Sequence, residues 1–170
     1  MLNSATSRLT LFQGSEVFID SNIFIYAGSK DHPLKPVCED FLFDVKYGKI
    51  TGFVNGRIVD EVFYRILLIE VSTKYALKAY EAPKFIKGNP KILKEIDVPR
   101  IVIEDILSFE GIKVVEIDRR VVNEAVKLSE VLLFSDAIHA ATCKVCGIKD
   151  IATNDSDFRR VDFLRVWKPQ

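Results

Sequence analysis

The chain has 170 residues, 48% of them hydrophobic, and this length and composition suit one globular domain with a full core. Its 24 Lys and Arg residues balance 24 Asp and Glu residues, which excludes recognition of nucleic acid by net charge alone. A surface that binds nucleic acid must therefore be a local basic patch, or depend on a metal or a partner. No uncharged apolar run approaches the ~20 residues of a membrane span, and residues 1–14 lack the pattern of a signal peptide, so we expect a cytoplasmic protein with no membrane segment.

Three cysteines are present, and Cys143 and Cys146 have a C-x-x-C spacing that can mark a zinc site or a redox site. Zinc has little support, because there is no second such pair and the only histidines are His32 and His139. A redox pair belongs at the start of a helix, whereas this pair lies within an apolar helical segment. We therefore interpret the cysteines, including Cys38, as reduced packing residues, which fits a reducing cytosol.

The first half of the chain alternates between apolar strands and amphipathic helices. We expect residues 1–15 to be a mobile lead-in or a short strand, preceding a single domain over residues 16–168. The apolar run at 16–20 predicts a strand buried on both faces, as in parallel sheets. A short helix over 21–27 ends at Gly28, a helix from Asp31 reaches about Tyr47, a strand covers 50–54 and a longer helix covers 55–73.

Residues 74–109 contain several prolines and glycines between apolar positions, which predicts a helical insertion made of three short pieces at 74–82, 90–96 and 100–109. Beyond it, the pattern predicts a strand at 112–117, helices at 119–133 and 134–147, and strands at 150–153 and 163–167. The alternation of strands and helices predicts an α/β fold with a central parallel sheet.

Several acidic residues stand where predicted strands end or predicted helices begin. Asp20 is the last residue of the first buried strand, and Asp155 and Asp157 follow the strand at 150–153. Asp136 stands in the first turn of its helix, and Glu61 stands in the first or second turn of the helix at 55–73. Because the carboxyl ends of parallel strands and the helices after them share one edge of the sheet, we expect these carboxylates to converge on one cleft.

Each acid also has an ordinary structural interpretation. Asp20 or Asp136 could be a helix cap, and Asp157 could be a turn residue. Glu61 could be a solvated helix residue, in which case its neighbour Asp60 could be the acid of the cluster. The order and position of the acids together favour a functional cluster. Two carboxylates ~4 Å apart repel by about 4 kcal/mol at an effective dielectric near 20, so a cluster requires shared protons or bound cations.

Oxygen ligands without a Cys and His set favour Mg²⁺ or Mn²⁺ over zinc, and such ions suit cleavage of a phosphodiester. Phosphatases and response-regulator receivers also place Asp residues at strand ends, but no clear Lys follows a late strand here. The sequence also lacks the glycine-rich motifs of phosphate-binding loops.

Four short segments, in this order, resemble the PIN-domain nuclease family, which includes the VapC-like toxins of prokaryotic toxin–antitoxin pairs. The segments are Val17–Asn22, Val59–Phe63, Ser135–Ala141 and Ile151–Phe158, and together the match spans residues 16 to about 167. The resemblance implies a three-layer α/β/α fold with a central parallel sheet. The insertion at about 74–109 is longer than expected for a compact toxin of this family.

The resemblance also implies a metal-dependent endoribonuclease that uses Mg²⁺ or Mn²⁺ on RNA, forms a homodimer and can pair with an antitoxin protein. The residues that match the family's acidic quartet are Asp20, Glu61, Asp136 and Asp155. Asp157 matches a frequent fifth acid, and Asn22 and Thr153 match supporting polar positions. Basic residues that could hold RNA phosphates at the rim of the cleft are Lys30, Lys35, Arg159 and Arg160. The alternative is a catalytically silent PIN-like module that binds proteins.

Overall fold

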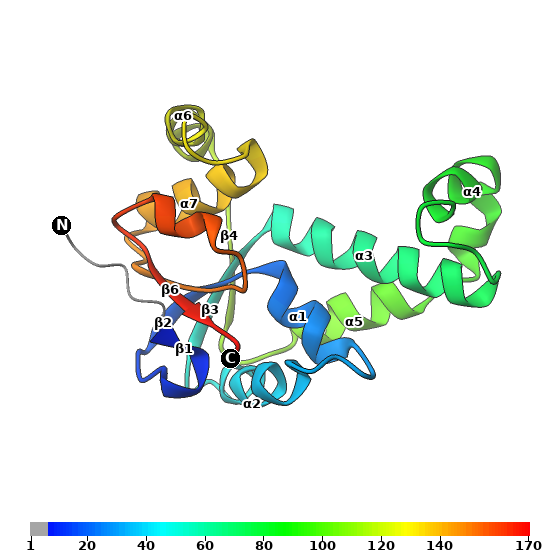
Figure 1. Cartoon of the computed structure of the whole chain (residues 1–170), viewed down its shortest axis with the longest axis horizontal. Coiled ribbons are helices and arrows are strands. Elements are labelled where there is room, and N and C mark those ends of the chain that lie inside the picture. The colour runs from blue at the N-terminus through cyan, green and yellow to red at the C-terminus, as the bar shows by residue number, and fades with distance from the viewer. Residues whose placement is uncertain (1–6) are drawn as a thin grey trace.

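The computed structural model describes residues 7–170, whose strands form one six-stranded sheet (Figure 1). The strand order is β1-β6-β5-β2-β3-β4, and every neighbouring pair is parallel. The strands are β1 (Ser7–Arg8), β2 (Glu16–Ile19), β3 (Thr51–Asn55), β4 (Ile112–Val115), β5 (Asp150–Ala152) and β6 (Arg165–Lys168). The predicted α/β fold with a parallel sheet is confirmed.

Helices cover both faces of this sheet. The chain moves along the sheet in one direction from β2 to β4 and in the other direction from β4 to β6. Because crossovers between parallel strands are right-handed, the first set of helices lies on one face and α6 and α7 lie on the other. The helices are α1 (Ser21–Gly28), α2 (Lys35–Lys46), α3 (Gly56–Lys74), α4 (Ala82–Gly88), α5 (Val98–Leu107), α6 (Arg119–Leu128) and α7 (Phe134–Cys146), with 3-10 helices η1 (Leu9–Leu11), η2 (Pro90–Lys94) and η3 (Asp157–Arg160). This confirms the three-layer α/β/α architecture.

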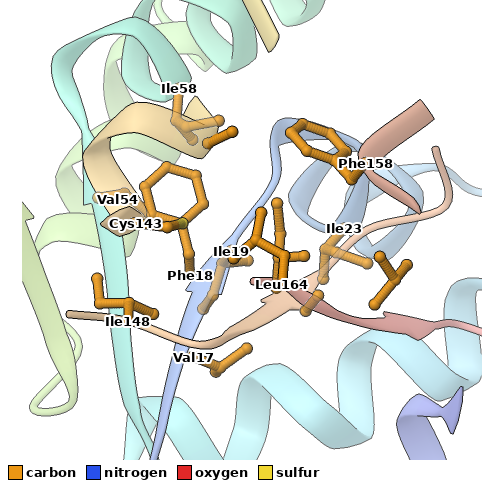
Figure 2. Close-up of a cluster of buried hydrophobic side chains, with 14 of the residues drawn as sticks. Val17, Phe18, Ile19, Ile23, Val54, Ile58, Cys143, Ile148, Phe158 and Leu164 are labelled. Carbon is orange, nitrogen blue, oxygen red and sulfur yellow. The ribbon is translucent and has the colours of Figure 1, made fainter. Parts of the chain in front are cut away.

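The main core is centred on β2. Val17, Phe18 and Ile19 are completely buried, and Figure 2 shows them among side chains from both helical layers, including Ile23 of α1 and Cys143 of α7. This confirms the prediction that the first apolar run is a strand buried on both faces. None of the helices within residues 7–170 is long and apolar enough to cross a membrane.

A second, smaller hydrophobic cluster lies away from the sheet. Leu67 and Val71 of α3 pack there against Ala82 of α4, Ile92 of η2 and Ile96. Figure 1 shows α4 beside the end of α3 that is farthest from the sheet. We call residues 74–100 the arm; it forms most of the predicted helical insertion and packs through this cluster of its own.

The predicted helical piece at 74–82 is wrong. Helix α3 continues to Lys74, the chain then turns with Ala76 in the left-handed region (φ 52°), and α4 begins at Ala82. Pro83 lies in the first turn of α4, where its missing N–H breaks no helical hydrogen bond, so this proline marks a helix start. The other two predicted pieces correspond to η2 and α5, shifted or shortened by about two residues at their ends.

Two further helix boundaries are also wrong. Helix α2 begins at Lys35 rather than at Asp31, and His32 supplies a local contact instead, since its Nδ1 accepts a hydrogen bond from the Leu34 N–H at 3.2 Å. Helix α6 ends at Leu128, five residues before the predicted boundary at 133. At the start of the described chain, β1 pairs with β6, which matches the short-strand alternative; residues 1–6 lie outside the described part, and the domain boundary at residue 16 stays a prediction.

Candidate functional site

The carboxyl ends of β2 and β5 form the part of the sheet edge at which the chain connections diverge. From β2 the chain passes to β3, whereas from β5 it passes to β6 on the other side. Open α/β sheets bind ligands in the crevice at such a switch point. Asp20 directly follows β2 and Asp155 lies in the turn after β5, so both acids flank this crevice.

Asp20 is 7% exposed and accepts hydrogen bonds from three residues. It is the N-cap of α1, with its Oδ1 accepting a hydrogen bond from the Ser21 N–H at 2.7 Å. Its Oδ2 accepts hydrogen bonds from the Asn22 side-chain amide and from the Thr153 hydroxyl. Burial raises the pKa of Asp20 although the Thr153 and Ser21 hydrogen bonds oppose that rise. The cap interpretation is therefore correct for Asp20 but accounts for only one of its contacts.

The two predicted supporting residues tie the end of β2 to the turn after β5. Asn22 Nδ2 also donates to Thr153 Oγ1 at 3.1 Å, and Asn22 Oδ1 accepts from the Asn154 N–H at 3.1 Å. Thr153 Oγ1 in turn accepts from the Asp155 N–H at 2.9 Å. Asp20, Asn22, Thr153 and Asp155 therefore belong to one hydrogen-bonded network that fixes the two strand ends relative to each other.

Four acids from four separate segments share one electrostatic environment. The pKa of Asp136, in the first turn of α7, is raised first by burial and then by the charge of Asp155, with smaller contributions from Asp20 and Glu61. The negative charges of these three carboxylates disfavour ionisation of Asp136 and so add to the effect of burial. Asp20 and Asp155 thus belong to one hydrogen-bonded network, and their charges, with that of Glu61, act on Asp136. The role predicted for these four acids as one cation-binding cluster stays a prediction.

Glu61, rather than its neighbour Asp60, faces this cluster. The Glu61 side chain is 25% exposed, whereas the Asp60 side chain is 65% exposed and pairs with Arg57 at 3.2 Å on the outside of α3. Arg57 Nε also donates to Glu61 Oε1 at 3.1 Å. Burial opposes ionisation of Glu61, but the nearby His139 and Arg57 outweigh it and lower the pKa of Glu61 overall.

His139 is a site residue that the sequence analysis missed. It is 2% exposed, and its Nε2 lies 3.5 Å from Glu61 Oε1, a distance at which the contact is electrostatic rather than a hydrogen bond. Nε2 has no hydrogen-bond partner within residues 7–170. His139 lies three residues after Asp136, on the same face of α7, and that spacing was the available sequence signal.

Asn55 determines which ring nitrogen of neutral His139 carries the proton. Asn55 is completely buried at the end of β3, and its Oδ1 caps α3 by accepting from the Ile58 N–H at 3.1 Å. Its Nδ2 must therefore point the other way, where it donates to Thr142 Oγ1 at 2.9 Å and lies 3.4 Å from His139 Nδ1. In the neutral ring Nδ1 then accepts, and the proton is on Nε2, towards Glu61.

The remaining predicted residues lie at the edge of the cluster. Asp157 begins η3, and its carboxylate pairs with the Arg160 guanidinium at 2.9 Å. Lys35 pairs with Glu39 at 3.5 Å, while Lys30 and Arg159 are exposed. The roles predicted for these residues in metal and RNA binding stay predictions.

The donor chemistry of the cluster fits a hard divalent cation, although the side chains do not yet form a complete metal site. No three Asp, Glu, His or Cys side chains in the described part of the chain are arranged so that they could already hold an ion. Both oxygens of Asp20 already accept hydrogen bonds. A cation bound there would offset the repulsion that adds to burial in raising the pKa of Asp136.

A groove of about 340 Å³ opens beside the acids, between α1 and α3. Its α1 side includes Ser21 and Tyr26, and its α3 side runs from Glu61 through Arg65 to Leu68. The groove therefore begins at the acidic cluster and follows α3 in the direction of the arm.

The C-x-x-C pair is not part of this site. Cys143 is completely buried in α7 and burial raises the pKa of its thiol well above the ordinary value, whereas Cys146, at the last position of α7, is exposed. Burial also raises the pKa of Cys38 to about 12. Cys38 and Cys143 are packing residues, as predicted, and Cys146 is not.

Comparison with known proteins adds an independent line of observation. A family model described as "PIN domain" matches residues 17–164. Two curated relatives from Methanocaldococcus jannaschii match nearly the whole chain. One, named Ribonuclease VapC2, is 31% identical over 163 residues, covering 94% of this chain and 97% of the relative. The other, Ribonuclease VapC6, is 25% identical over 159 residues, covering 91% and 97%.

The fold also occurs in a solved structure. The crystal structure of VapBC2 from Rickettsia felis bound to a DNA fragment from their promoter aligns with a TM-score of 0.56, covering 90% of this chain and 98% of that one. Sequence identity is 14%, so this likeness concerns the fold alone.

Proposed function

Because the chain belongs to the PIN-domain family, we propose that it is an endoribonuclease that hydrolyses RNA phosphodiester bonds with a divalent cation, Mg²⁺ or Mn²⁺, at the acidic cluster. Two relatives that match over nearly their whole length are named ribonucleases, which supports this activity. The observation that carries the proposal is the hydrogen-bonded network that fixes Asp20, at the end of β2, to the turn that holds Asp155 after β5. Asp136 lies close enough for these charges to add to the effect of burial on its pKa. Such a concentration of carboxylates is stabilised by cations.

The ion would be held by Asp20, Asp136 and Asp155, with Glu61 available for a second ion or for a water molecule. A bound divalent cation would make a water molecule more acidic and neutralise charge on the non-bridging oxygens of the phosphate. Oxygen donors of this type suit Mg²⁺ or Mn²⁺. Whether Asp157 joins them depends on its release from Arg160.

The chain's own residues orient these groups. Asn22 and Thr153 restrict the Asp20 carboxylate, and Thr153 also fixes the backbone at Asp155, so both acids keep their positions when an anionic substrate approaches. Glu61, with its lowered pKa, stays ionised at neutral pH and can accept a hydrogen bond from the attacking water. In the hydrolysis, the water oxygen forms a bond to phosphorus and the P–O bond to the leaving ribose oxygen breaks.

Cleavage of single-stranded and structured RNA tests the proposal, with Mg²⁺, Mn²⁺ or EDTA present. We expect cutting that requires the cation and falls by at least about 100-fold in Asp20→Asn and Asp136→Asn, because each change removes an anionic oxygen ligand. The matched control is Asp60→Asn, which removes a carboxylate next to Glu61 that points away from the cluster and should leave the rate unchanged.

The outcomes separate the alternatives. Full activity in Asp20→Asn would contradict the site assignment. Absence of cutting together with absence of calorimetric metal binding would favour a catalytically silent PIN-like module that binds proteins. Metal binding without cutting of either RNA would mean that the site is correct and the substrate class is wrong.

Pairing with an antitoxin and assembly as a homodimer are parts of the same proposal. The relatives carry the VapC name, and the structural neighbour is a VapBC complex, which supports an antitoxin partner for this chain. Light scattering of the purified chain at two concentrations measures its self-association. Co-purification with the product of a neighbouring gene, followed by loss of cleavage in the complex, tests the antitoxin.

A further inference from the structure

The arm carries a concentration of positive charge that the rest of the chain does not share. Residues 74–100 contain seven Lys and Arg residues against three acidic residues, a net charge of +4. The whole chain has a net charge of 0, so the remainder has a net charge of −4. A polyanion is therefore attracted to the arm and repelled by the remainder, where the acidic cluster lies.

The four lysines of α4 and η2 have no ionic partner among the described residues, and neither has Lys78 in the turn before α4. Lys84, Lys87, Lys91 and Lys94 are exposed, and none lies within 4.0 Å of a carboxylate among residues 7–170. The acids of the arm are engaged elsewhere, since Glu95 pairs with Lys74, Asp97 pairs with Arg100, and Glu81 accepts a hydrogen bond from the Lys78 backbone N–H. The charge of these four lysines is thus available to an external ligand.

The arm presents this charge on a packed support rather than on a loose loop. The four lysines lie on α4 and η2, and Ala82 and Ile92 of the same segments are buried against α3. Beside Lys84 there is a shallow depression of about 540 Å³ that is also lined by Tyr80 and Phe85, and Tyr80 is 73% exposed. Positive charge next to an exposed aromatic ring is the combination that holds nucleic-acid strands.

The arm is connected to the acidic cluster by the groove along α3. Thirteen residues separate Glu61 from the end of α3 at Lys74, which is about 20 Å at a helical rise of 1.5 Å per residue. The groove covers the first part of this path, from Glu61 to Leu68, and Leu68 packs against the hydrophobic cluster of the arm. A strand that leaves the cluster along the groove therefore heads towards the arm.

We propose that the arm is a second RNA-binding surface, on which Lys84, Lys87, Lys91 and Lys94 hold the sugar–phosphate backbone several nucleotides away from the bond that is cut. The inference rests on the proposed function, which supplies RNA as the polyanion. Such contacts bind phosphates without reading sequence, so the arm favours RNA that is long enough to extend from the acidic cluster to the arm, whatever its bases. An acidic protein partner would meet the same charge, but only a strand bound along the groove would use both surfaces together.

Binding is the decisive measurement, because it does not require cleavage. Fluorescence anisotropy in EDTA compares a dinucleotide, which is too short to cover about 20 Å, with a long single-stranded RNA of about 24 nucleotides, which covers that distance even at the roughly 3.4 Å rise of a stacked strand. The arm variant carries Lys84→Gln, Lys87→Gln, Lys91→Gln and Lys94→Gln. The control variant carries Arg8→Gln, Lys113→Gln, Arg119→Gln and Lys149→Gln, an equal change of charge at exposed positions outside the arm that form no ion pair among residues 7–170.

For the wild type we expect affinity that rises with RNA length. The arm variant should bind the long RNA at least about tenfold more weakly and lose most of this length dependence, and the slope of log K against log salt should fall by about 3 for four lost single-strand phosphate contacts. The control variant should keep both properties. Circular dichroism and thermal melting of both variants should match those of the wild type, because the exchanged side chains are exposed.

Equal loss of affinity in the two variants, or unchanged affinity in the arm variant, would overturn the proposal. Unchanged RNA binding with loss of binding to a partner protein would overturn it as well and assign the arm to that partner. Failure of the wild type to cut RNA refutes the proposed function, while the anisotropy data still decide the role of the arm.

Discussion

His139 and Asn55 show what sequence could and could not reveal about single residues. The positions of Asp20 and Asp155 followed from the rule that parallel strands end on one edge, because each acid stands next to an apolar run of its own. His139 stands among the buried residues of α7 and has no such marker; its role depends on Asn55, which is 84 residues away. The choice of Glu61 over Asp60 likewise required the orientation of α3, and the pairing of Asp157 with Arg160 required the turn after β5.

The pKa of Asp136 leads to a prediction about stability. Burial and the neighbouring carboxylates raise this pKa, so folding favours the protonated form. That contribution is fully present below the unfolded pKa near 3.9 and is lost as the pH rises through the folded pKa. At pH 7 in EDTA, Asp136→Asn should therefore raise Tm by roughly 1–3 °C, a modest gain because the carboxylate is partly solvated. Calorimetry near pH 3 should show no gain; a gain of equal size at both pH values would contradict the argument, and Asp60→Asn serves as the control.

Strands and long amphipathic helices were the predictable elements, whereas segments with buried residues in turns were not. The apolar runs of β2 and β5 are continuous, and α3 has an unbroken apolar stripe, so each was assigned correctly. Leu132 is buried although α6 ends at Leu128, and Leu77 packs in the arm although α3 ends at Lys74. These side chains continue the helical spacing through turns, so periodicity alone placed the end of α6 five residues late and assigned a helical piece to the turn that follows α3.

Gly111, just before β4, lies so close to the backbone of Val45 and Ile50 that a side chain does not fit there. A Cβ at this position would lie 2.2 Å from the backbone oxygen of Ile50 and 2.5 Å from that of Val45, and backbone cannot move aside as a side chain can. We expect Gly111→Ala to lower the free energy of unfolding by at least about 2 kcal/mol in urea denaturation. Gly56→Ala, with nothing within 4 Å of its Cβ, is the control and should be neutral or slightly stabilising. Equal stability of the two variants would show that β4 can shift without cost.

The whole molecule contains two hydrophobic clusters of unequal size, and they should differ in cooperativity. The cluster around β2 extends through both helical layers, whereas the cluster of the arm is small. Regions with fewer buried contacts open at lower free energy than the global transition. Native-state hydrogen exchange should therefore show faster exchange in α4 and η2 than in β2.

Ile96→Ala makes this difference measurable. Ile96 is buried only within the cluster of the arm, and truncation of a buried Ile typically costs about 2–5 kcal/mol. We expect amide exchange in α4 and η2 to accelerate by at least about tenfold, with little change in β2. Equal acceleration in β2 would mean that the arm and the sheet unfold together. The matched change in the main core, Ile23→Ala, should accelerate exchange throughout.

The hydrogen bond between Thr153 and Asp20 joins residues that lie 133 positions apart in the chain. At a synthesis rate of about 5–20 residues per second, a ribosome adds Thr153 roughly 7–27 s after Asp20. During that interval β2 has no β5 beside it, and Asp20 has neither the Thr153 hydroxyl nor Asp155 as a neighbour. The end of β2 and the turn after β5 can therefore be joined only late in translation, once the segment after β5 has left the ribosome.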